Sequence, residues 1–234
     1  MKKTWSILCA LFTLTTATFA QETTFTKFLG IPIDGTKHEM IQKLKAKGFT
    51  DAGPYSNADL IGEFNGRDVE VSVVTNNNKV YRIAIFDRYS ISETDIKIRF
   101  NKLCRQFENS PKYDSAILGK QSIPEDEDIS YEMIVNSKRY EAVFYQHLEE
   151  RTKYPEKIED YLLSVFSQEQ LDNPNEEEKL QISNMKLEFT KVAMQDIFTS
   201  DARSVWFMIS NERAGYKILM FYDNNLNRSN GEDL

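Results

Sequence analysis

Apolar and polar residues alternate most clearly within residues 59–87. Val69, Val71 and Val73 are separated by polar residues, which is the period of a strand with one buried face and one solvent-facing side. Asn65-Gly66 precedes this run, and both residues tolerate the positive φ angles of a type I′ turn. With a second turn in the asparagine-rich run that follows, the pattern predicts a three-stranded antiparallel meander.

Two helices with 3.6-residue spacing are expected on either side of the meander. The first begins at Thr36, forms a capping box with Glu39, and is stopped by Gly48. The second begins at the Ser92 and Asp95 capping signal. Its predicted apolar face comprises Ile96, Phe100, Leu103, Cys104 and Phe107.

The second half of the chain predicts two further helices and two hairpins. One helix starts at about Pro155, and another follows Pro174 and extends to about Thr199. The expected hairpins pair 129–135 with 138–146 and 204–210 with 216–222. Because the last two runs carry apolar residues on both faces, they are predicted to be the most buried strands of the protein.

A helix followed by a hairpin therefore occurs three times, which predicts an α+β fold with helices packed on antiparallel meander and hairpin sheets. The best candidate boundary lies near Arg151, between 21–150 and 151–234. The two parts can also form one continuous domain.

Residues 1–20 have the order of a secretory signal peptide, with Lys2-Lys3, an apolar run and small residues ending at Ala20. The run is too short to span a bilayer, which needs ~20 residues. Removal of the two lysines changes the formal charge from −7 to −9. We therefore expect a periplasmic or secreted protein that has no membrane span and does not bind nucleic acid.

Candidate catalytic and metal-binding residues are sparse. After cleavage, Cys104 is the remaining cysteine, so no intramolecular disulfide is expected, and its place on an apolar helix face favours a core role over a nucleophile activated by His147. Glu125–Asp128 and Asp223–Asn227 are expected as solvated loops, with calcium sites as the alternative. No cofactor is predicted.

Aromatic residues on predicted strands are the main candidates for binding. Tyr131, Tyr140 and Tyr145 are expected on the open sheet face, where tyrosine suits contact with a protein or glycan partner, and ordinary cross-strand packing is the alternative. Asp114-Ser115-Ala116 resembles a short motif at which some Gram-negative anaerobes attach O-glycans. Ser115 is therefore a candidate modification site in a polar loop.

The segment Phe28–Phe49, the following meander, Ser204–Tyr222 and the closing Asn-Gly-Glu-Asp-Leu resemble a group of secreted proteins from Gram-negative anaerobes. That resemblance implies no particular activity. The order of helix and meander is more loosely similar to β-lactamase-inhibitor proteins and small outer-membrane assembly lipoproteins. Those proteins are binding modules, although their second helix and lipid-bearing cysteine have no counterpart here.

The sequence therefore predicts an exported, non-enzymatic binding or interaction protein of the cell envelope or extracellular space. A hydrolase whose site assembles only in the fold is one alternative. A structural envelope protein that self-associates is the other.

Overall fold

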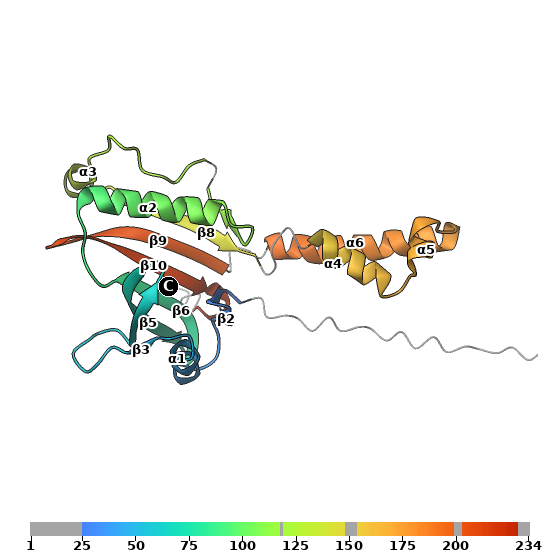
Figure 1. Cartoon of the computed structure of the whole chain (residues 1–234), viewed down its shortest axis with the longest axis horizontal. Coiled ribbons are helices and arrows are strands. Elements are labelled where there is room, and N and C mark those ends of the chain that lie inside the picture. The colour runs from blue at the N-terminus through green and yellow to red at the C-terminus, as the bar shows by residue number, and fades with distance from the viewer. Residues whose placement is uncertain (1–24, 118, 148–153, 199–202, 229–234) are drawn as a thin grey trace, which may run out of the picture.

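A computed structural model of the chain describes residues 25–117, 119–147, 154–198 and 203–228. Figure 1 shows the strands and helices in these ranges. The helices are α1 (Lys37–Lys45), α2 (Glu93–Glu108), α3 (Ile129–Val135), α4 (Tyr154–Leu163), α5 (Gln168–Asp172) and α6 (Glu176–Phe198), with a short 3₁₀ turn, η3, at Asn225–Asn227. The strands are β1 (Lys27–Phe28), β2 (Ile31–Pro32), β3 (Thr50–Asp51), β4 (Leu60–Phe64), β5 (Arg67–Asn76), β6 (Lys79–Asp87), β7 (Tyr113–Ser115), β8 (Glu141–Gln146), β9 (Arg203–Glu212) and β10 (Gly215–Asn224).

Eight of these strands form one antiparallel sheet in the order β3-β4-β5-β6-β10-β9-β8-β7, while β1 and β2 form a separate two-stranded hairpin. The predicted α+β class is therefore confirmed. The hairpin β9–β10 lies between β6 and β8, so strands from both sides of position 151 belong to the same sheet. Arg151 itself and the expected signal peptide lie outside the described residues.

The predicted meander is present as β4, β5 and β6. Asn65 and Gly66 have φ angles of 52° and 72°, as a type I′ turn requires. Val69, Val71 and Val73 are all buried, which confirms the face assigned to them. Both capping signals are also present, at Thr36 with Glu39 and at Ser92 with Asp95.

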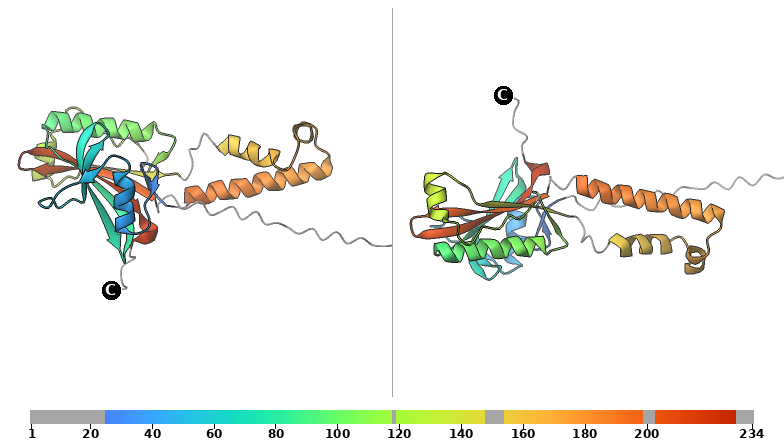
Figure 2. Two further views of the ribbon diagram at one scale, coloured as in Figure 1. Left: turned by 60° about the horizontal axis from the view of Figure 1, so that its bottom comes forward. Right: turned by 90° about the horizontal axis from the view of Figure 1, so that it is seen from above.

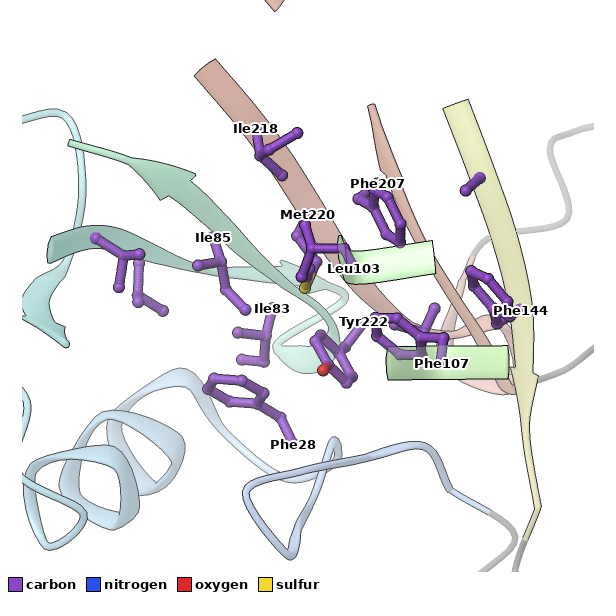
Figure 3. Close-up of a cluster of buried hydrophobic side chains, with 14 of the residues drawn as sticks. Phe28, Ile83, Ile85, Leu103, Phe107, Phe144, Phe207, Ile218, Met220 and Tyr222 are labelled. Atoms are coloured by element: carbon purple, nitrogen blue, oxygen red, sulfur yellow. The ribbon is translucent and has the colours of Figure 1, made fainter. Parts of the chain in front are cut away.

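One face of the sheet carries the main hydrophobic core. α1 packs against β5 and β6, and α2 packs against β7, β9 and β10. Figure 3 shows side chains from α2, β6, β8, β9 and β10 meeting in this core. Phe107 stacks on Phe144 with 4.8 Å between ring centroids, and Phe100 meets Phe207 edge-on at 5.1 Å. Helix–sheet packing therefore stabilises this part of the chain.

Helices α4, α5 and α6 form an arm, which lies between β8 and β9 in the sequence. Figures 1 and 2 show α4 and α6 side by side, extending away from the sheet. The arm has a small core of its own, in which Leu162, Phe166 and Ile182 are buried and Leu171 and Met185 pack against them. α6 follows the predicted fourth helix through Phe198, where the described segment ends.

The predicted hairpin over 129–146 is wrong in its first half, because Ile129–Val135 is helix α3. The side chain of Asp128 accepts a hydrogen bond from the backbone N–H of Tyr131 at 2.8 Å and so caps the helix. The Glu93 carboxylate accepts the N–H of Ile129 at 3.1 Å and joins α3 to the start of α2. These contacts override the strand propensity, and the helix-then-hairpin unit does not occur a third time.

The C-terminal hairpin is present but is not buried on both faces. Buried and half-buried residues alternate along β9 and along β10 as far as Tyr222. The polar segment expected from Asp223 onward starts inside the sheet, because Asp223 and Asn224 are buried members of β10. No helix in the described residues is long and apolar enough to cross a membrane.

Candidate functional site

The face of the sheet opposite α1 and α2 carries a continuous group of apolar side chains. Strand alternation directs these residues away from the core, and the antiparallel register places Leu219 beside Phe86 and Met208, and Phe221 beside Trp206. All of them are half-buried, so they keep contact with solvent. We call this group the open-face patch: Phe86, Val143, Trp206, Met208, Leu219 and Phe221.

The aromatic rings of the patch are held by one another. Trp206 stacks on Phe221 with a centroid separation of 4.2 Å and an interplanar angle of 24°. Phe86 meets Phe221 edge-on at 6.2 Å and 82°. Such contacts are typical of stabilising aromatic pairs, so the patch presents a fixed apolar surface.

An ion pair lies next to the stacked rings. Arg82 Nε and Nη2 donate to the two carboxylate oxygens of Asp223 at 2.6 and 2.7 Å, and Trp206 Nε1 donates to Asp223 Oδ2 at 3.0 Å. The guanidinium carbon lies 4.9 Å from the centroid of the Phe221 ring. The hydrogen bonds with Asp223 raise the pKa of Arg82 above its usual value. The polar groups at this end of the patch are therefore satisfied within the protein.

Charged residues border the opposite end of the patch, near the β9–β10 turn. Lys217 precedes Leu219 by two residues on the same face of β10, and Arg88 stands two residues after Phe86. Arg139 contacts the sulfur of Met208 at 3.8 Å and pairs with Glu141 at 3.0 Å. Three cations therefore lie at this end, and one of them is neutralised by an adjacent carboxylate.

The structure does not gather the three tyrosines expected on the open face. Tyr131 is exposed but lies on α3, not on a strand. Tyr140 is 5% exposed and belongs to the core, with its hydroxyl donating to Glu127 at 2.5 Å. Burial, followed by the nearby Glu127 carboxylate, raises the pKa of Tyr140. Tyr145 is half-buried beside Ser204 on the same face as the patch.

Ser115 lies at the end of the edge strand β7 and is exposed. The prediction that Ser115 lies in a loop is therefore wrong, because this residue is the last one of a strand. Its hydroxyl donates to the carbonyl of Ile117 at 2.7 Å and accepts from Gln121 at 3.0 Å. Its glycosylation stays a prediction.

Cys104 is fully buried on α2, which confirms the core role expected for it. Burial, with a smaller effect of Glu108, raises the pKa of its thiol to about 12. The buried ring of His147 is hydrogen-bonded through Nε2 to Asp114 Oδ2 at 2.7 Å. The geometry therefore gives no support to an activated thiolate at Cys104.

The two stretches considered as calcium sites, Glu125–Asp128 and Asp223–Asn227, have structural roles in the fold. Glu127 accepts from Lys138 and Tyr140, and these hydrogen bonds lower its pKa. Asp128 caps α3, and Asn227 donates to Asp34 at 2.8 Å and to the carbonyl of Val80 at 2.9 Å. Within the described residues, no group of three or more His, Cys, Asp and Glu side chains is placed to hold a metal ion.

A hollow of about 160 Å³ lies where α2 meets the β4–β5 turn, between Phe64, Phe107, Tyr113 and Tyr222. Burial is the main cause that raises the pKa of both tyrosines. General acid–base catalysis near neutral pH requires a group with a pKa close to 7. The pKa values of these two tyrosines are shifted further above 7. The hollow therefore gives the hydrolase alternative no acid–base pair.

The sequence contained a signal for the patch, because apolar residues occur at both odd and even positions of 204–210 and 216–222. In a strand, such a pattern places apolar side chains on both faces of the sheet. Trp206 and Phe221 lie within these two runs. However, their face and their register beside Phe86 depend on the pairing of β10 with β6, which no local pattern encodes. Comparison of the chain with protein-family models, curated proteins and solved structures finds no match.

Proposed function

We propose that the protein is an exported binding module that contacts another protein through the open-face patch. The observation that carries this proposal is the half-buried cluster of six apolar side chains on the face opposite the helices. Contiguous apolar surface on a folded protein marks interaction sites, and aromatic residues and methionine are enriched in them. Export rests on the signal-peptide pattern of residues 1–20.

The chemistry of the patch favours a protein partner over a glycan. A glycan needs polar groups that can exchange hydrogen bonds with its hydroxyls. At the patch, the Asp223 carboxylate and the Trp206 N–H already bond within the protein. The surface that remains is apolar and is bordered by charge, which matches the apolar centre and polar rim of a protein interface.

Site-specific photo-crosslinking in the native host tests this proposal. A p-benzoylphenylalanine residue replaces Leu219 in the patch, and in the matched control it replaces Ile98, which is 59% exposed on α2. We expect a discrete protein adduct from position 219 and none from position 98. No adduct at 219, or the same adducts from both positions, would contradict the proposed function.

A further inference from the structure

The arm has an apolar stripe that its own core does not use. Leu180 and Leu187 are 64% and 54% exposed, although they lie on the same helix as the buried Ile182. Residues seven apart lie on one side of a helix, about 10 Å apart along its axis. α6 therefore presents one apolar side to α4 and a second side to solvent.

The stripe and the open-face patch match in size and in charge. The patch crosses β6, β10, β9 and β8, a width of about 14 Å at the usual spacing of strands. Residues 154–198 contain ten acidic and four basic residues, a net charge of −6. The patch is bordered by Arg88, Lys217 and Arg139, although Glu141 pairs with Arg139 and Glu70 lies beside Phe86. α6 itself contains five acidic and three basic residues, so most of the negative charge comes from the rest of the arm. An acidic arm with an apolar stripe therefore complements this face.

We infer that the partner of the open-face patch is the arm of a second copy of this chain. The arm extends away from its own sheet in each view, so its stripe does not lie over its own patch (Figures 1 and 2). In a two-fold symmetric dimer, each copy places α6 on the sheet of the other. The dimer then has two equivalent contacts, and each buries one open-face patch against one apolar stripe. This inference rests on the proposed function, because it names the protein that the patch binds.

Light scattering during size exclusion of the mature protein gives the first test. We expect twice the mass of one chain for the wild-type protein and the mass of one chain for Leu187→Glu and for Leu219→Glu. Ile98→Glu, a matched change at an exposed apolar residue of α2, stays dimeric. Circular dichroism of each variant verifies that the fold is retained. A wild-type protein that is monomeric at the highest concentration tested overturns the inference.

The charge of the border is tested by Lys217→Glu. We expect at least a tenfold loss in dimer affinity at low salt, and a smaller loss as salt is added, because ions screen exposed charges. Arg105→Glu on the far side of the sheet, in the last turn of α2, is the matched control and leaves the affinity unchanged. An equal effect of the two variants contradicts the role of this border.

Cross-linking separates failure of this inference from failure of the proposed function. Isotopically light and heavy copies, each with p-benzoylphenylalanine in place of Leu219, are mixed, irradiated and digested. We expect peptides that join position 219 of one copy to residues 176–191 of the other. A link within one copy overturns the inference. A monomer whose position 219 captures a different host protein overturns the inference and leaves the proposed function intact, and no adduct overturns both.

Discussion

Asp223 is the most consequential charged residue on the open face, because its side chain is only 3% exposed and its charge is balanced by Arg82. Two hydrogen bonds from Arg82 and one from Trp206 satisfy the Asp223 carboxylate at the edge of the aromatic stack. A buried charge that loses its partner costs several kcal/mol. The position of the aromatic stack therefore depends on this pair.

Arg82→Met should lower the free energy of unfolding by about 3 kcal/mol, because it leaves the Asp223 charge buried without its cation. Adding Asp223→Asn should restore part of that loss. Arg139→Met removes an exposed partner of Glu141 and should cost no more than about 1 kcal/mol. Urea titration of the three variants measures these differences, and equal losses for Arg82→Met and Arg139→Met would show that burial of Asp223 has no energetic role.

Cys104 should make unfolding depend on alkaline pH. Its folded-state pKa of about 12 is raised above the ordinary 9.0, so the unfolded state releases this proton first as pH rises. The stabilisation is fully present below pH 9.0 and is lost as pH rises towards 12. The difference in unfolding free energy between the wild-type protein and Cys104→Ala should therefore shrink over that interval.

Thiol labelling gives a second measurement at Cys104. We expect no reaction of the native protein with iodoacetamide near neutral pH and complete reaction in urea. Rapid labelling of the native protein would contradict the buried position of the side chain.

At the scale of elements, close approach between α1 and the sheet depends on Gly62 in β4. A Cβ atom at this position would lie 2.6 Å from the Phe49 ring, which real contacts do not allow. Phe49 directly follows Gly48, which has a positive φ angle in the turn after α1, and Phe49 is itself buried. The path of the chain from α1 into the meander therefore needs a residue without a side chain on β4.

Gly62→Ala should destabilise the protein by about 1–3 kcal/mol through overpacking. Phe49→Leu removes the ring that the new methyl group meets, so the double variant should be more stable than the sum of the two single changes predicts. Thermal unfolding of all four proteins gives the coupling. Strict additivity would show that the ring moves aside freely.

Elements whose signals are local were predictable from the sequence. Thr36 with Glu39, Asn65-Gly66 and the alternation of Val69, Val71 and Val73 each specify a structure within a few residues. α3 was not predictable, because Ile129 is fixed by Glu93, which lies 36 positions earlier in the chain. An open sheet face was expected, but the residues of the open-face patch were not predicted for a similar reason, since the neighbours of Phe221 come from β6 and β9.

At the scale of the whole molecule, the sheet and the arm have separate cores. The arm buries Leu162, Phe166 and Ile182, whereas the sheet core extends from Phe28 to Tyr222. Burial of apolar surface is the main source of stability, and so small a core supplies little of it. The arm should therefore open more readily than the sheet.

Hydrogen exchange read by mass spectrometry should show this difference. In the Leu219→Glu variant, which we expect to be monomeric, amides of α4 and α6 should exchange well before those of β6, β9 and β10. Phe166→Ala should speed exchange in the arm and leave the sheet unchanged. Simultaneous exchange of both parts would show that they unfold as one cooperative unit.

The position of β9 and β10 between β6 and β8 has a consequence for the newly made chain. Synthesis proceeds from the N-terminus, so the ribosome completes β6 and β8 before the two strands that join them exist. Until residues 203–224 emerge, both earlier strands have free backbone groups along one side, and such edges invite association with other chains. A transcript cut short before this hairpin should therefore yield insoluble product, even though it encodes six of the eight strands.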